Sequence, residues 1–327
     1  MTLLLKGSEV RALLGLDECI AAVELAFRLY GEGAAPAPGV LGAQVPGGGF
    51  HIKTALLPGS RSYFAAKVNG NFSANPQRFG LPAIQGVIVL ADAEQGRPLA
   101  VMDSIEITVL RTGAATAVAA RHLARPASRV AIVCGCGLQG RIQLRALARV
   151  LPLARAFAWD LHPDRAKAYA AEMSAELRID VTPAADLGAA VSQSDVCVTC
   201  TPSRAPFLEA GVLRPGTFVA AVGADSPDKQ ELHPGVLASA KVVVDVLDQC
   251  AAIGELHHAL ESGRMTRAGV HAELGQVVAG RKTGRTSDAE IAVFDSTGTA
   301  LQDAAAAALV YEKAIRAGAG TEIALED

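Results

Sequence analysis

The sequence lacks long apolar runs and any concentration of basic residues. Nowhere do about 18 apolar residues follow one another, and the opening segment MTLLLKGSEV has too short an apolar run for a signal peptide. Lysine and arginine number 30 against 33 aspartates and glutamates, which gives a net charge of −3. This balance provides no basic field for nucleic acid and no polybasic patch for a membrane. We therefore expect a soluble, cytoplasmic protein whose partner is a small molecule.

Disulfide and metal-ligand patterns are also missing. Six cysteines in a chain of 327 residues need no disulfide framework. Cys197 and Cys200 form a C-x-x-C, but they stand in an expected strand, which would direct them to opposite faces. His257 and His258 are adjacent rather than at metal-ligand spacing, and no H-E-x-x-H is present. We expect no metal site.

Acidic residues are absent from residues 33–91, although basic residues are not. Alternating apolar runs in this segment predict strands near residues 40–44, 50–57, 63–69 and 84–90. A sheet with only positive side chains suits an anionic ligand such as a carboxylate, and the alternative is a basic face exposed to solvent. His51 and Lys53 share one face of their strand by its two-residue period, so either could hold a carboxylate.

Two further basic residues stand in apolar surroundings. Lys67, in SYFAAKVNG, shares a strand face with Tyr63 and Ala65, and desolvation there would lower the pKa of its amine toward a value useful in catalysis. Its alternative place is an exposed strand edge. Arg111, in IEITVLRTGAATAVAA, requires a fixed anion, because an unpaired buried guanidinium is costly. That anion is a substrate carboxylate, a cofactor phosphate or a carboxylate of the protein itself.

A dinucleotide-binding fingerprint occupies the middle of the chain. Residues 130–134 form a β-branched run, Gly135, Gly137 and Gly140 follow at G-x-G-x-x-G spacing, and a helical pattern begins near residue 138. The glycines allow a tight turn, close approach of a pyrophosphate and close helix packing. Asp160 ends the next strand, where its carboxylate can accept hydrogen bonds from ribose hydroxyls.

The remaining pattern predicts an α/β protein with two domains. A Rossmann doubly wound parallel sheet is expected over residues 125–298, because strands alternate there with helices. Residues 1–124 and 299–327 are expected to form a discontinuous, β-rich domain. Helices are expected near residues 8–14, 17–30, 104–123, 163–176, 251–261, 272–278 and 299–316, and the later strands near residues 99–102, 156–159, 179–181, 196–199, 218–222, 242–245 and 290–294.

Asp225 and Thr201 are candidates because of where they stand in this sheet. Asp225 follows the strand FVAAV, and Thr201 follows the strand before it. Ligands of open parallel sheets bind beyond the carboxyl ends of the strands, so both side chains are aimed at a cofactor and its substrate. The alternative for Asp225 is a turn cap before Pro227.

With these residues identified, the chain resembles the ornithine cyclodeaminase/mu-crystallin family over nearly its whole length. The matching segments are KVNGN with Lys67, LRTGAATAVAARHL with Arg111, GCGLQG, VGADSPDKQEL with Asp225, and VFDSTGTALQD with Ser296. The resemblance implies a homodimer of two-domain subunits, in which the domain of residues 1–124 and 299–327 is the substrate-binding and dimerisation domain. It also implies hydride transfer between a nicotinamide cofactor and the α-carbon of an amino or imino acid.

The resemblance assigns roles by position. Lys67 would contact the substrate carboxylate and assist proton transfer, Arg111 would bind substrate, and Asp225 would hold the amine or imine nitrogen as acid or base. The residues expected around the cofactor are Thr112, Gly135, Gly137, Leu138, Gln139, Gly140, Asp160, Thr201, Val222, Lys229 and Ser296. We expect NAD(H), because Asp160 repels a 2′-phosphate, with NADP(H) as the alternative because His162 and Arg165 stand close by.

Two departures from the family pattern direct the choice of substrate. The segment APAPGVLGAQ lacks the arginine that usually clamps the substrate carboxylate, so Lys53 or His51 would take its place. No acid is available in residues 33–91 for the distal amine of ornithine. The sequence therefore favours a reductase of a cyclic imino acid of the Δ1-pyrroline-2-carboxylate type. The enzymatic alternatives are an ornithine cyclodeaminase and an alanine-type dehydrogenase. The non-enzymatic alternative is a mu-crystallin-like protein that binds a small ligand or a nucleotide.

Overall fold

The structure is a computed structural model that describes residues 1–325, and the chain divides into two compact units. Unit 1 contains Met1–Arg111 and the segment beginning at Thr299, and unit 2 is Thr112–Gly298. We expected the first boundary after residue 124, whereas this division falls inside helix α4 (Ser104–Leu123). Residues 326–327, which end the expected substrate domain, lie outside the described residues. No helix within residues 1–325 is both long enough and apolar enough to span a membrane.

Unit 1 is built on a sheet of seven strands in the order β15-β1-β6-β5-β4-β3-β2. β1 and β6 are parallel, and all other neighbours are antiparallel. The strands are β1 (Thr2–Leu5), β2 (Gly39–Val45), β3 (Gly48–Leu57), β4 (Tyr63–Asn71), β5 (Ile84–Asp92), β6 (Pro98–Asp103) and β15 (Thr321–Ile323).

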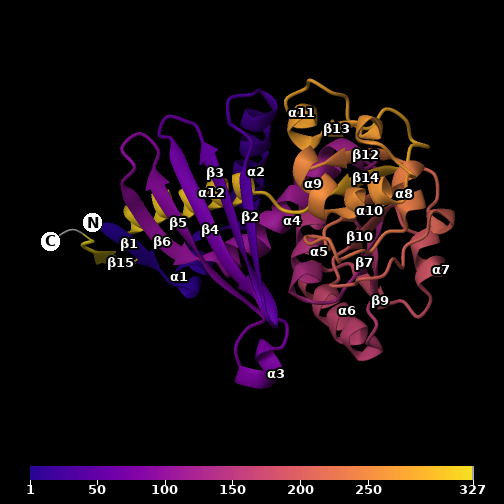
Figure 1. Cartoon of the computed structure of the whole chain (residues 1–327). Helices are drawn as coiled ribbons and strands as arrows, with labels where there is room; N and C mark the ends of the chain where they lie inside the picture. The colour runs from indigo at the N-terminus through magenta and orange to yellow at the C-terminus, as the bar shows by residue number, and fades with distance from the viewer. Residues whose placement is uncertain (326–327) are drawn as a thin grey trace. The chain divides into compact units, whose positions relative to one another are not determined.

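The two faces of this sheet differ, because side chains alternate along each strand. In β4, Tyr63, Ala65 and Lys67 are buried, whereas Phe64 and Val68 are exposed. Helix α12 (Ala300–Ala317) covers the buried face and packs on β3, β4 and β5, as Figure 1 shows in yellow. Its many alanines allow this close packing, and α2 (Leu16–Gly31) packs on it in turn. The remaining helices of unit 1 are α1 (Gly7–Leu13) and α3 (Asn75–Phe79).

Unit 2 is built on eight parallel strands in the order β13-β12-β14-β11-β10-β7-β8-β9. The order from β9 to β14 is that of a Rossmann sheet, so the expected fold class is confirmed. The direction of winding reverses between β7 and β10, and the glycine turn follows β7. The strands are β7 (Val130–Cys134), β8 (Arg155–Trp159), β9 (Asp180–Pro183), β10 (Val196–Thr199), β11 (Phe218–Ala221), β12 (Lys241–Val244), β13 (Ala272–Glu273) and β14 (Ala292–Asp295).

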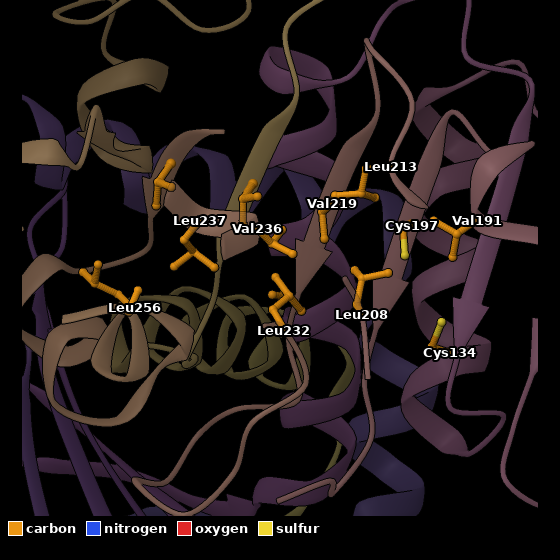
Figure 2. Close-up of a cluster of buried hydrophobic side chains, with 14 of the residues drawn as sticks. Cys134, Val191, Cys197, Leu208, Leu213, Val219, Leu232, Val236, Leu237 and Leu256 are labelled. Atoms are coloured by element: carbon orange, nitrogen blue, oxygen red, sulfur yellow. The ribbon is translucent and has the colours of Figure 1, made fainter. Parts of the chain in front are cut away.

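A buried apolar cluster lies on one face of this sheet (Figure 2). It joins side chains of the central strands, such as Cys134, Cys197 and Val219, to helix residues such as Val236 and Leu256. Every residue of β10, β11 and β14 is buried, so the continuous apolar strands seen in the sequence are those of a sheet covered on both faces. The helices of unit 2 are α5 (Leu138–Val150), α6 (Pro163–Leu177), α7 (Leu187–Ser192), α8 (Pro234–Ala238), α9 (Leu247–Ile253), α10 (Glu255–Glu261) and α11 (Leu274–Val278), with short η1 (Ala210–Val212) and η2 (Arg267–Gly269).

The helix expected over residues 251–261 is wrong in its extent, because the structure has two helices there, α9 and α10. Gly254 separates them with an extended backbone, and the N–H groups of Glu255 and Leu256 donate to the Asp295 carboxylate at 3.2 and 2.9 Å. This carboxylate satisfies the first N–H groups of α10, so a new helix begins at that point.

Other differences arise from strand pairing. The helix expected over residues 272–278 begins only at Leu274, since Ala272 and Glu273 pair with β12. β1 and β15 were not expected, because four and three residues carry little periodic signal. Both are defined by pairing with strands remote in sequence, which no local pattern records.

Candidate functional site

The glycine turn of unit 2 has a different steric requirement at each glycine. Gly135 has φ +107°, a conformation that L side chains rarely adopt, and a Cβ there would lie 2.9 Å from the carbonyl oxygen of Cys200. A Cβ at Gly140 would lie 2.2 Å from the carbonyl oxygen of Gly135. A Cβ at Gly137 would meet no atom within 4 Å. Gly135 and Gly140 are therefore needed for the turn and its packing, while Gly137 leaves open space at the start of α5.

Asp160 lies beside this turn and is held by two backbone groups. Its Oδ2 accepts from the N–H of Cys136 at 3.0 Å, and its Oδ1 accepts from the N–H of His162 at 3.0 Å. These bonds fix the carboxylate at the carboxyl end of β8. A carboxylate oxygen has two lone pairs, so Asp160 can still accept hydrogen bonds from a ribose.

A pocket of about 400 Å³ opens between the ends of β7, β8 and β10. Trp159 and Phe207 contribute aromatic rings whose centroids are 5.2 Å apart. This is the crevice in which parallel sheets bind nucleotides, and its apolar walls suit a planar base. The lining residues are Gly135, Gly137, Trp159, Asp160, Leu161, His162, Arg165, Cys200, Thr201, Pro202, Ser203 and Phe207.

Two predicted cofactor residues stand at the start of α5. Leu138 is largely exposed. Gln139 has a buried Oε1 atom that has no hydrogen-bond partner among the described residues. A buried acceptor without a partner, next to the open side of Gly137, is consistent with a ligand group that donates to it. The geometry of the glycine turn is therefore suited to a dinucleotide.

Three other predicted cofactor residues do not line the pocket. Thr112 begins the part of α4 that belongs to unit 2. The N–H of Val222 donates to the carbonyl of Thr199 at 2.9 Å and so continues the sheet beyond β11. Ser296 is buried, and its hydroxyl donates to Oδ2 of Asp245 at 3.3 Å. Their cofactor roles rest on the resemblance alone.

Asp225 lies in the loop that follows β11, as expected. Its Oδ1 lies 2.5 Å from Nζ of Lys229, so the two predicted residues form an ion pair. The ring Nε2 of His258 lies 2.9 Å from the carbonyl oxygen of Lys229. The loop that carries Asp225 is thereby tied to helix α10.

Glu231, which the sequence reasoning missed, joins the two loops that carry Thr201 and Asp225. Its carboxylate accepts from the N–H of Thr201 at 2.5 Å and from the N–H of Gly223 at 3.0 Å. Burial raises the pKa of Glu231 to about 7, although these N–H groups oppose the change. A buried carboxylate therefore sets the spacing of the loops at the carboxyl ends of β10 and β11.

One group of side chains in residues 1–325 has the spacing of metal ligands. The nearest ligand atoms of His257, His258 and Glu261 all lie within 4.8 Å of one another. From the sequence, the two adjacent histidines were not at metal-ligand spacing, but their ring centroids are only 5.1 Å apart, and Glu261 lies one helical turn after His257. Because Nε2 of His258 is engaged by the carbonyl of Lys229, only its Nδ1 remains for a metal ion.

In unit 1, the predicted basic residues of the sheet lie together. Lys53 of β3 pairs directly with Lys67 of β4, and His51 pairs with Asn69. Lys53 and Lys67 are both buried, and they share the face that α12 covers. An exposed basic face, the alternative considered from the sequence, does not describe these two lysines.

Asp303 of α12 supplies the anion for this cluster. Its Oδ2 lies 2.7 Å from Nζ of Lys67, and its Oδ1 accepts from Nε of Arg111 at 2.9 Å. A second guanidinium nitrogen of Arg111 donates to Oε1 of Gln302 at 2.8 Å, and Nζ of Lys67 lies 3.5 Å from the Thr108 hydroxyl. Three anions were considered as partners of Arg111 from the sequence. In the structure its partner is a carboxylate of the protein itself, that of Asp303.

The electrostatics of this cluster depend on its burial. Burial lowers the pKa of Lys67 to about 7, and Asp303 opposes that change. Burial would raise the pKa of Asp303, but the positive charges of Lys67 and Arg111 outweigh it and hold that pKa below its usual range. At neutral pH, Asp303 is ionised and Lys67 can both give and take a proton.

The residues missed from the sequence each had a weak signal. Asp303 is a lone acid just before the alanine run of residues 304–308, and Glu231 is the last acid of the segment SPDKQEL. Trp159 and Phe207 stand in apolar runs, where an aromatic residue is most often part of the core. Each of these residues acts together with a contact partner that is remote in sequence, so no local pattern identified it.

Comparison with known proteins agrees with this arrangement. A family profile described as "Ornithine cyclodeaminase/mu-crystallin family" matches residues 1–318. The alanine dehydrogenase of Archaeoglobus fulgidus is 42% identical over 323 residues, which is 98% of either chain.

Two solved structures have the same fold over nearly the whole chain. An archaeal alanine dehydrogenase dimer with bound NAD has a TM-score of 0.95 at 41% identity, covering 99% of both chains. The Δ1-pyrroline-2-carboxylate reductase of Thermococcus litoralis, in complex with NADH and L-proline, has a TM-score of 0.90 at 34% identity, covering 98% of this chain and 100% of the other. On the family match, the sequence identity and the shared fold, this chain belongs to the ornithine cyclodeaminase/mu-crystallin family.

Proposed function

We propose that the protein is an NAD(H)-dependent oxidoreductase that acts at the α-carbon of a small amino or imino acid. The observation that carries this proposal is that the same chain contains both a dinucleotide crevice, in unit 2, and a cluster of buried cations, in unit 1. The relatives crystallised with NAD or NADH support the choice of cofactor.

Unit 2 provides the residues that would hold the cofactor. Gly137 leaves room for a pyrophosphate at the start of α5, and the helix N-terminus favours its negative charge. Asp160 would accept hydrogen bonds from the adenosine ribose, which favours NAD(H) over NADP(H). When bound, the nicotinamide supplies or receives a hydride at the substrate α-carbon.

Unit 1 provides the charge that would hold a carboxylate. Lys53, Lys67 and Arg111 bring three basic groups, and Asp303 brings one acid. We assign substrate-carboxylate binding to Lys67 and Arg111, with Lys53 and His51 in support. Asp225 or Lys67 would keep the imine nitrogen protonated, which makes its carbon a better hydride acceptor.

Within this class, two substrates are favoured by different observations. The identity to an alanine dehydrogenase favours an acyclic imino acid, formed from pyruvate and ammonia, and it now stands ahead of our first hypothesis. The likeness to a Δ1-pyrroline-2-carboxylate reductase keeps the cyclic imino acid as the second candidate. Ornithine cyclodeamination ranks below both, because residues 33–91 contain no acid and Asp303 is already bound to Lys67 and Arg111.

The test is NADH oxidation with pyruvate plus ammonia and, in parallel, with Δ1-pyrroline-2-carboxylate. Turnover of either imino acid supports the proposal, and the ratio of the two kcat/KM values ranks the substrates. If NADH binds but neither compound nor ornithine is turned over, the oxidoreductase proposal fails and a binding role replaces it.

We also propose that the protein forms a homodimer through the exposed face of the sheet in unit 1. Apolar side chains on β2 to β5 lie on that face without cover from α12. An apolar surface of this kind commonly marks a protein interface. The similar archaeal enzyme was crystallised as a dimer. The exposed apolar residues on that face are Leu41, Val45, Phe50, Phe64, Val68 and Val87.

A further inference from the structure

The cluster around Asp303 holds several charges in a buried place. Lys53, Lys67 and Arg111 are 7%, 3% and 5% exposed, and Asp303 is fully buried. Cys19 of α2 is also near, but burial raises the pKa of its thiol to about 12, so it carries no charge at neutral pH. The cluster therefore has three basic groups and a single acid.

Asp303 is the group that makes this arrangement possible. Lys53 and Lys67 are direct partners across β3 and β4, and like charges in that position repel. Asp303 reaches the sheet from α12 and contacts Lys67 with one carboxylate oxygen and Arg111 with the other. Three elements remote in sequence are thus joined at one carboxylate.

We propose that Asp303 is a positioning residue, which holds the Lys67 ammonium group and the Arg111 guanidinium group side by side and keeps Lys67 protonated for an anionic substrate. This inference rests on the proposed function, in which these two cations bind the substrate carboxylate. Gln302 completes the arrangement by fixing a second nitrogen of Arg111.

The charges that face Lys67 give the direction of the effect. Burial, Arg111 and Lys53 all lower the pKa of Lys67, and Asp303 is the group that raises it. Without the Asp303 carboxylate, only the influences that lower the pKa of Lys67 remain. Neutralising Asp303 should therefore lower the midpoint of Lys67 by about one to three pH units, the usual effect of a nearby opposite charge.

The experiment is a pH titration of the full-length protein labelled with ¹³C at the lysine ε-carbon. The chain contains only eight lysines, so the spectrum is sparse, and Lys67→Met identifies the signal. In the wild type, the Lys67 signal should titrate near pH 7. In Asp303→Asn it should titrate at least one pH unit lower.

A matched control tests whether the shift of the Lys67 midpoint is specific to Asp303 or follows the loss of any carboxylate on α12. Glu312 lies on the same helix but bonds to the hydroxyl of Tyr63, so Glu312→Gln should leave the Lys67 midpoint unchanged. Should Asp303→Asn not fold, Lys53→Met with and without Asp303→Asn gives the same comparison with one fewer buried cation. In that background too, loss of Asp303 should lower the midpoint.

Enzyme kinetics provides the second measurement. Where Lys67 must be protonated, kcat/KM falls tenfold per pH unit above its midpoint, and in Asp303→Asn this fall should begin lower by the shift seen in the spectra. An unchanged midpoint in a folded Asp303→Asn protein overturns the inference and leaves Asp303 a structural counter-ion. Absence of imino acid turnover in the wild type overturns the proposed function instead.

Discussion

Gly137 and Gly140 have opposite surroundings although they are three residues apart. A Cβ at Gly137 would meet nothing within 4 Å, whereas a Cβ at Gly140 would lie 2.2 Å from the carbonyl oxygen of Gly135. The first glycine therefore leaves space for a ligand and the second leaves space for the protein itself.

Alanine substitutions should separate these two roles. Gly137→Ala should keep the thermal stability of the wild type and weaken NADH binding by about tenfold or more, because the methyl group occupies the ligand's space. Gly140→Ala should lower the free energy of unfolding by about 1–3 kcal/mol, because the helix must move from β7. Thermal melting and NADH fluorescence titration measure both effects. Equal effects of the two variants on binding and on melting would contradict this assignment.

Asp160 should control the preference for NADH. Asp160→Asn removes the charge that repels a 2′-phosphate, and His162 and Arg165 already line the pocket. The ratio of the NADPH and NADH dissociation constants should therefore fall by about tenfold, a change of about 1.4 kcal/mol. Asp164→Asn is the control, since that carboxylate is 97% exposed at the start of α6. If both variants keep the wild-type ratio, Asp160 does not select the cofactor.

Asp225 should be required for turnover and dispensable for cofactor binding. Asp225→Asn removes a proton carrier, and general acid or base groups contribute about 10²–10⁴-fold to rates. We expect kcat to fall within that range while the NADH dissociation constant stays within about twofold. Asp228→Asn provides the control in the same loop, because Asp228 is exposed and pairs with Arg204. Full activity of Asp225→Asn would remove Asp225 from the mechanism.

The buried carboxylate of Glu231 should make stability depend on pH. Burial raises its pKa to about 7 in the folded state from 4.5, so between these values the folded protein keeps a proton that the unfolded chain has released. Stability from this group is therefore fully present below pH 4.5 and is lost as pH rises to 7. Glu231→Gln should remove up to about 1.4 kcal/mol per pH unit from that slope.

Urea unfolding between pH 5 and pH 8 measures this slope. Asp288→Asn serves as the control, since Asp288 is exposed on the same unit. A Glu231→Gln protein whose unfolding free energy has the wild-type pH dependence would show that Glu231 titrates normally. Asp295, whose pKa burial also raises to about 7, contributes a slope of the same sign in both proteins.

The exposed sheet face of unit 1 should determine the oligomeric state. Val68→Glu places a charge in the middle of that face, so the protein should sediment as a monomer where the wild type sediments as a dimer. Ile315→Glu is the control, because Ile315 is an exposed apolar residue of α12 rather than of the sheet. Analytical ultracentrifugation distinguishes the two masses. A dimeric Val68→Glu protein would place the interface elsewhere.

The sequence by itself determined the nucleotide-binding half of the protein. The run from Val130 to Asp160 is local, because a buried strand, a glycine turn and a helix start each leave a signal within a few residues. Alternation alone also grouped Lys67 with Tyr63 and Ala65 on one face of its strand, and the structure shows that this face is buried. These steric and periodic constraints act between residues that are neighbours in the chain, so they can be recognised from the sequence.

Only the tertiary structure decided which groups neutralise one another. Lys67 and Arg111 are separated from Asp303 by 236 and 192 positions, and no periodicity links them. Likewise, β15 forms by pairing with β1, which itself pairs with β6, and α10 begins where Asp295 caps it. A buried charge requires a partner, but the sequence does not say which one, because that choice is made when remote segments pack.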